Sequence, residues 1–215
     1  MIKQVHPLQG LRRHLLAASL ALCAAGAHCA PVTYTIVSKI SRVNFNLEHQ
    51  GFIQLFGTLK IAPGSLVFDN EDWSKSSVVV DMPTKKLDMG DALWNGQIRG
   101  DESWAALFKA PNIRFRSTRV ERQDDTHGTM AGDLTIGAIT KPVLLQMRVN
   151  KIGRNEISEK SSIGVSATTT IKRSQFGLDA YADLVGDELA VQIQLEAAIG
   201  PDPDAQTEAR LNRKL

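Results

Sequence analysis

The feature that most constrains this chain is a pair of apolar–polar alternations that meet at a short turn, around Gly132–Val149. In the first run, Met130, Leu134 and Ile136 fall on one face. Every second residue of the other run is apolar as well: Val143, Leu145, Met147 and Val149. Successive side chains of a strand point to opposite faces, so each run has one apolar face and one largely wetted face. The joint at residues 137–142 contains a glycine and a proline, which are both poor inside a ladder, and the segment therefore predicts a β-hairpin.

Alternation of the same kind recurs along the rest of the chain. We expect further strands at Tyr34 and Ile36 and within residues 43–49, 57–61, 66–69, 77–82, 113–120, 163–171 and 189–199. The short connections between them favour antiparallel pairing of about eight to ten strands. A chain of 215 residues suits one domain with a sizeable core. The sequence therefore predicts an all-β barrel or sandwich.

One region breaks this rhythm. The apolar residues between Asp91 and Ala110 follow no strand alternation, and they predict one or two short helices. Ser103 is the expected cap of a helix over residues 104–108, and Pro111 is its expected stop. We expect these helices to lie against one end of the barrel, with glycines at 96 and 100 dividing the segment into two pieces.

The first 27 residues have the pattern of a secretory signal peptide. Basic residues precede the apolar run Leu15–Leu22, and small residues then allow cleavage after Ala27 or after Ala30. We therefore expect a periplasmic protein with a leader at 1–27, one domain at 28–200 and a polar tail at 201–215. The apolar run of the leader is too short for a membrane-spanning helix.

Charge and cysteine content exclude several classes. Of the 25 Lys and Arg residues, three lie in the leader, which leaves 22 against 23 Asp and Glu. A nearly neutral chain gives no support for nucleic-acid binding, which needs a basic face. The mature chain keeps at most Cys29, so it has no internal disulfide and must be held together by burial.

Few residues are suited to catalysis or to binding metal ions. The histidines left after cleavage are His28, His49 and His127, and no metal-ligand spacing, phosphate-binding glycine loop or nucleophile elbow is present. A hydrolase would need His49 or His127 beside a nucleophile, so we expect no enzyme and no catalytic residue. His49 continues the phase of Phe45 and Leu47, which leaves two interpretations. In the first, it is a polar group at a cavity mouth. In the second, which is the more common for a single histidine, it is a core histidine hydrogen-bonded to backbone.

Four segments carry recognisable motifs, in this order: residues 41–51, which end in His-x-Gly; residues 111–118, a Pro-x-Ile-x-Phe-x-Ser-Thr strand; the hairpin 132–143; and residues 171–178 followed by 185–189. In these segments the chain resembles the YceI-like family of exported lipid-binding proteins. Together the four segments span about 34–200. Two differences from the family pattern stand out: Gln50-Gly51-Phe52 replaces the more usual Met-Gly-Ile, and the region 98–108 lacks a histidine.

The resemblance implies an extended antiparallel lipocalin-like β-barrel of about eight strands with one or two short helices. Its lumen would hold a polyisoprenoid, an isoprenoid quinone or a fatty amide, with no catalysis, no metal and no cofactor; a homodimer is one assembly we consider. By strand phase and aromatic size, the expected ligand-binding residues are Phe45, Leu47, His49, Phe52, Phe56, Trp94, Trp104, Phe108 and Phe115. The same aromatic residues would cap a solid core if the protein were instead a periplasmic structural or stress-related interaction protein.

Overall fold

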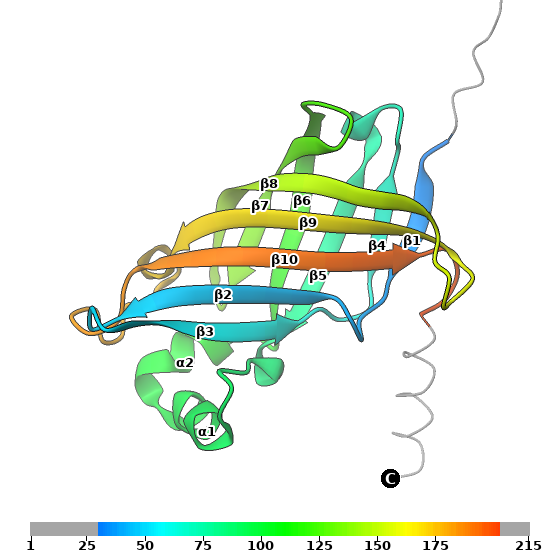
Figure 1. Ribbon diagram of the computed structural model, residues 1–215. Coiled ribbons are helices and arrows are strands. Elements are labelled where there is room, and N and C mark those ends of the chain that lie inside the picture. Colours follow the sequence, from blue (N-terminus) through cyan, green and yellow to red (C-terminus); the bar gives the residue numbers. More distant parts are fainter. Residues whose placement is uncertain (1–29, 203–215) are drawn as a thin grey trace, which may run out of the picture.

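The computed structural model describes residues 30–202, and its fold is almost entirely β-structure (Figure 1). The predicted signal peptide, and all of the predicted tail except Pro201 and Asp202, lie outside the described residues. The strands are β1 (Val32–Ile36), β2 (Arg42–His49), β3 (Ile53–Lys60), β4 (Ser65–Phe68), β5 (Ser77–Pro83), β6 (Asn112–Arg122), β7 (His127–Ile136), β8 (Ile139–Arg154), β9 (Ser161–Lys172) and β10 (Glu188–Ala198). The helices are α1 (Ala92–Gly100) and α2 (Ala105–Phe108), with 3-10 turns η1 (Trp73–Lys75), η2 (Thr84–Lys86), η3 (Glu102–Trp104) and η4 (Arg173–Phe176).

Eight of the strands close into an antiparallel barrel, which confirms the predicted fold class. The order runs β1-β4-β5-β6-β7-β8-β9-β10, and β1 pairs with β10 to complete the ring. The closing contact is short, with Thr35 opposite Ala198 and Ile36 opposite Ala197. In the earlier part of β10, residues 190–194 pair with β2 instead of β1. β2 in turn pairs with β3 over its whole length. The β2–β3 hairpin therefore extends the barrel beyond the closed ring, as Figure 1 shows.

The predicted hairpin exists, but its turn is shorter than expected. β7 and β8 are joined by only two residues, Gly137 and Ala138, and Gly137 adopts a φ of 59°. A glycine at the first of two turn residues suits a hairpin of this length. Pro142 lies inside β8, opposite Asp133, which contradicts its expected place in the turn. The strand tolerates it because β8 pairs with β9 only from Gln146 onward, so one edge at Pro142 needs no N–H donor.

The helical insert also forms where the sequence predicts it, but with different caps. The side chain of Asp91 accepts a hydrogen bond from the Trp94 N–H at 2.8 Å, which begins α1. Asp101 does the same for the Ser103 N–H at 2.8 Å, so Asp101, not Ser103, caps the second helical turn. Gly96 lies within α1 instead of dividing it. A carboxylate two or three residues before a free N–H is a stronger cap than the hydroxyl we expected, because it also interacts favourably with the helix dipole.

Candidate ligand-binding cavity

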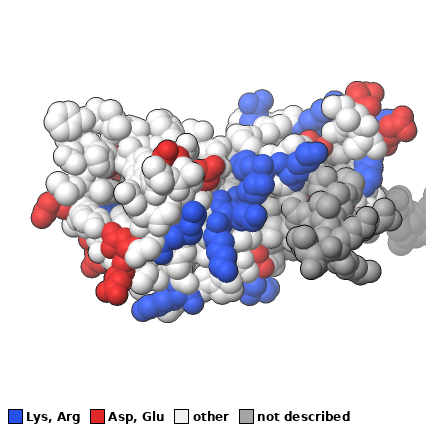
Figure 2. All heavy atoms as spheres, turned by 90° about the horizontal axis from the view of Figure 1, so that it is seen from below, with Lys and Arg blue, Asp and Glu red and all other residues white. Residues whose placement is uncertain are grey.

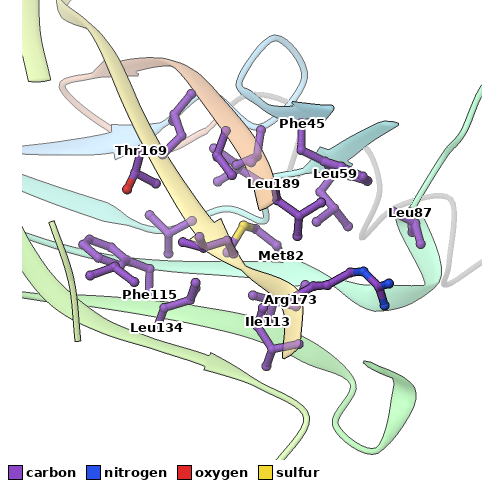
Figure 3. A pocket seen from close by; sticks show the side chains of 18 of the residues that line it. Phe45, Leu59, Met82, Leu87, Ile113, Phe115, Leu134, Thr169, Arg173 and Leu189 are labelled. Carbon is purple, nitrogen blue, oxygen red and sulfur yellow. The ribbon is translucent and has the colours of Figure 1, made fainter. Parts of the chain in front are cut away.

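The barrel contains a cavity of about 470 Å³, within the range of small-molecule sites. Every strand from β2 to β10 contributes side chains to its wall, whereas β1 contributes none. The lining is predominantly apolar and includes Val43, Leu55, Leu59, Val80, Met82, Ile113, Met130, Leu134, Leu145, Val165, Ala167, Ile171, Leu189, Val191, Ile193 and Leu195. Figure 3 shows such side chains converging from strands on several sides. The lumen is therefore hollow over part of its length.

Strand phase explains how β2 and β3 supply this wall. Val43, Phe45, Leu47 and His49 all line the cavity, so the predicted inward phase of this strand is confirmed. Phe45 lies opposite Gly57 on β3, and a Cβ atom on Gly57 would lie only 2.2 Å from the Phe45 ring. The glycine therefore provides the space in which this ring lies.

Six of the nine predicted ligand-binding residues line the cavity: Phe45, Leu47, His49, Trp94, Trp104 and Phe115. The other three do not. Phe52, at the β2–β3 turn, is 84% exposed, and Phe56, on the outward phase of β3, is 68% exposed. Phe108 is half-buried on α2 but one residue beyond Leu107, which is the residue of that helix on the cavity wall. Aromatic size placed these three phenylalanines in the predicted set, and strand or helix phase places them outside the lumen.

Charged side chains are unevenly distributed over the face that carries α1 and α2. In Figure 2, which views the molecule from the side of α1 and α2, most of the charged side chains in the left part of the face are Asp and Glu. Lys and Arg instead form a band across the middle of that face. The β2–β3 turn lies at the same left end of the molecule (Figure 1).

Polar groups enter the cavity wall mainly beneath α1 and η3. They include Gln97 and Asp101 from the insert, Arg173 from η4 and Tyr181 from the β9–β10 connection. The Tyr181 hydroxyl donates to Asp101 Oδ2 at 2.7 Å, and the Trp104 and Tyr181 rings lie 6.2 Å apart. These contacts join the helical insert to the β9–β10 connection, so together the two segments cover one end of the lumen.

The hydrogen bond between Tyr181 and Asp101 shifts the ionisation of both groups. It lowers the pKa of Asp101, to which the Ser103 N–H and hydroxyl also contribute. It raises the pKa of Tyr181, because ionising the phenol would remove the donor and add a second negative charge. The pair is therefore most stable with a charged carboxylate and a neutral phenol.

His49 and Arg173 occupy neighbouring positions on this wall. His49 forms an isolated bridge with Val185, and the Arg173 Nη2 donates to the Val185 carbonyl oxygen at 2.7 Å. His49 is half-buried, and its ring lies 3.5 Å from Gln50 Nε2. Arg173 was not among the predicted site residues, because its position in η4 follows no strand alternation that would indicate an inward side chain.

Neither a metal-ligand cluster nor a membrane-spanning helix is present between residues 30 and 202. No three His, Cys, Asp or Glu side chains in this range are grouped closely enough to hold a metal ion. None of the helices described there is long and apolar enough to cross a membrane.

The sequence has similar proteins in several bacteria. A UPF0312 protein of Photorhabdus laumondii is 28% identical over 182 residues, which cover 85% of this chain and 93% of that protein. The protein YceI of Salmonella arizonae is 29% identical over 154 residues, covering 72% of this chain and 79% of its own.

Solved structures share the fold. BcnA of Burkholderia cenocepacia superposes with a TM-score of 0.66 at 21% identity, covering 75% of this chain and 99% of that one. A polyisoprenoid-binding domain from Saccharophagus degradans has a TM-score of 0.54 at 12% identity, covering 77% and 97%. The family model of the YceI-like domain matches residues 34–197, nearly the whole barrel. This chain therefore belongs to the YceI-like domain family, as its four sequence segments predicted.

Proposed function

We propose that this protein is an exported, non-enzymatic binder or carrier of a long-chain apolar lipid held in the barrel lumen. The observation that carries the proposal is the cavity of about 470 Å³, whose apolar wall is drawn from nine strands and whose polar groups gather mainly beneath α1 and η3. A tail in the lumen and a head at that end would match this distribution. The polyisoprenoid-binding domain of Saccharophagus degradans, which shares the fold, supports the same ligand class.

The expected ligand is a polyisoprenoid, an isoprenoid quinone or a fatty amide. Burying each CH₂ contributes about 0.8 kcal/mol, so about ten buried groups contribute about 8 kcal/mol, which corresponds to a dissociation constant near micromolar. Immobilising the ligand offsets part of this gain. An apolar wall can therefore hold such a tail without many polar contacts, and an export signal would place the carrier where a free lipid is poorly soluble.

The test is native mass spectrometry of the protein prepared gently from a periplasmic extract, followed by organic extraction of what it holds. We expect a discrete added mass that yields a long-chain lipid. A clean unliganded mass, unchanged after incubation with isoprenoid quinones and fatty amides, would contradict the proposal. The same spectra report whether the protein is a homodimer, which stays a prediction.

A matched pair of variants connects binding to the lumen. Ala167 is 7% exposed and lines the cavity, whereas its neighbour Thr168 is on the outward phase of β9. Ala167→Trp should fill the lumen and abolish lipid binding, and Thr168→Trp should leave binding unchanged. Equal binding by both variants would mean that the lipid lies elsewhere. The hollow lumen gives no support to the alternative of an interaction protein with a filled core.

A further inference from the structure

The polar end of the cavity is organised around one buried cation. Arg173 is 2% exposed and lines the cavity, and the centre of its guanidinium lies 5.7 Å from the Trp104 ring centroid. Tyr181, whose ring is near that of Trp104, and His49, which adjoins Val185, line the same end. Figure 3 shows the Arg173 head extending away from the apolar side chains such as Phe115 and Leu134. It is the only Lys or Arg on the cavity wall described here.

Backbone carbonyl oxygens, and no carboxylates, accept the hydrogen bonds of Arg173 within residues 30–202. Nε donates to the Gly186 oxygen at 2.9 Å, Nη1 to those of Leu178 and of Ala180 (2.8 Å), and Nη2 to that of Val185 at 2.7 Å. A guanidinium has five N–H donors, so these four hydrogen bonds leave one N–H on Nη2 unused. Carbonyl dipoles and an aromatic face reduce the free-energy cost of burying the positive charge, but they do not neutralise that charge.

Two carboxylates near this end of the cavity, Asp101 on its wall and Asp187 beside η4, accept hydrogen bonds from other donors. Asp101 accepts from the Ser103 N–H and from the Tyr181 hydroxyl, at 2.8 and 2.7 Å. Asp187 accepts from the Ser174 N–H and hydroxyl, at 2.8 and 2.9 Å. The pKa of Asp187 is lowered mainly by the Ser174 N–H, with a smaller contribution from the positive charge of Arg173. The cation consequently has an unfilled donor at the cavity wall.

We infer that Arg173 selects the ligand by its head group. Resting on the lipid-binding function proposed above, the inference is that the bound amphiphile carries a hydrogen-bond acceptor, such as a carbonyl, carboxylate or phosphate oxygen, which takes the remaining Nη2 N–H. Its tail then lies along the apolar wall. A head group that only donates, such as an alkylammonium, would bring its own positive charge next to that of Arg173. It would also find no hydrogen-bond acceptor on the Arg173 side chain. A hydrogen bond to a charged group is stronger where water is excluded, so this one contact provides discrimination that the apolar wall lacks.

The first experiment uses the unaltered protein and two charged amphiphiles of equal chain length. Dodecanoate accepts hydrogen bonds only and dodecylammonium donates only, and each is titrated below its aggregation concentration against a bound apolar fluorescent dye at pH 7.5. We expect dodecanoate to bind about tenfold or more tightly, as one charge-assisted hydrogen bond would give. Equal binding, or tighter binding of the ammonium, overturns the head-group inference but leaves the lipid-binding function intact. If neither amphiphile displaces the dye and the dye itself does not bind, the proposed function has failed instead.

The second experiment removes the cation. Arg173→Gln should lose most of the preference for dodecanoate, taken as the ratio of the two amphiphiles' affinities for the same variant, with circular dichroism checking the fold. The control is Lys172→Gln, which removes the same charge from the adjacent, exposed residue and should keep the preference. A folded Arg173→Gln variant with the full preference overturns the inference. If that variant does not fold, the titrations of the unaltered protein still decide the question.

Discussion

The two ends of this barrel are made by the same long strands but are closed in different ways. At one end β1 inserts between β4 and β10 and completes the ring, and Ile36, Ile163 and Ala197 there are fully buried. At the other end β2 replaces β1 as the partner of β10, and β3 pairs with β2 but with no further strand among residues 30–202. Eight closed strands enclose an interior that side chains can just fill. The difference teaches that the open side needs other segments to cover the cavity, whose wall also includes Leu66 and Phe68 of β4 in the closed ring.

The open side is covered by non-strand segments. An isolated bridge joins Thr58 of β3 to Asp88, and Leu87, Met89, Trp94 and Ile98 then reach the cavity wall. The Tyr181–Asp101 hydrogen bond joins this cover to the β9–β10 connection. The open side therefore depends on these non-strand segments, and not on a further strand among residues 30–202, for its cover.

The strongest test of this difference between the two ends truncates one isoleucine near each end of β9. Ile163 is 0% exposed at the closed end, whereas Ile171 is 9% exposed and lines the cavity. Ile163→Ala should lower the free energy of unfolding by about 2–5 kcal/mol, because it opens a void in packed surroundings. Ile171→Ala should cost less, since part of its surroundings is already empty. Urea denaturation measures both, and equal losses would mean that the two ends are equally packed.

Gly137 allows a test of how the cover is fixed to the barrel. Its φ of 59° disfavours other residues, and a Cβ there would lie 2.2 Å from the Ala106 carbonyl oxygen of α2. Gly137→Ala should therefore destabilise the protein by about 1–3 kcal/mol and displace α2. The control is Gly96→Ala within α1, where a Cβ meets nothing within 4 Å and helix propensity predicts a gain of about 0.5–1 kcal/mol. Thermal unfolding measures the change in stability of each variant. A change of the same sign in both would contradict this account.

The strand pattern, but not the pattern of closure, could be predicted from the sequence. Period-two alternation is local, so the inward phase of Phe45 and Leu47 on β2 and the hairpin partners of β7 and β8 followed directly from it. Which strand closes onto β10 depends on pairings between residues more than 140 positions apart, such as Thr35 and Ala198, and no local pattern encodes them.

The candidate site was predicted in part for the same reason. Residues in regular alternation were placed correctly on the wall, whereas Phe52 and Phe56 were included for their size and are exposed. Arg173 was missed because a basic residue after a strand normally indicates solvent. Its inward position depends on the η4 turn and on carbonyl groups from residues 178–186, which only the folded chain brings together.

A third test addresses the mobility of the cover through pH. The pKa of Asp101 is lowered below its ordinary 3.8, so its contribution to stability is present above that value and is lost as pH falls through the lower, folded pKa. The pKa of Tyr181 is raised above 10.0, so its contribution is present below that value and is lost as pH rises through the folded pKa. Opening of residues 92–108 should therefore be rarest between about pH 4 and 10.

Hydrogen exchange of α1, corrected for the intrinsic pH dependence of exchange, measures this opening. Tyr181→Phe should raise the opening within that window to the level found outside it, while the global free energy of unfolding changes little, since the bond is exposed. A variant with unchanged exchange would show that Trp104 packing alone holds the cover.

The smallest effect is expected at the exposed phenylalanines, and it sharpens the boundary of the hollow end. Phe56 is on the outward phase of β3, next to the inward-facing Leu55. Phe56→Ser should change the free energy of unfolding by less than about 0.5 kcal/mol and leave the affinity for a bound lipid unaltered. Leu55→Ser should weaken lipid binding, because it puts a hydroxyl on the apolar wall. If Phe56→Ser weakened binding as much as Leu55→Ser, the ligand would have to extend over the outer face of the β2–β3 hairpin, and the division between wall and surface drawn from strand phase would be wrong.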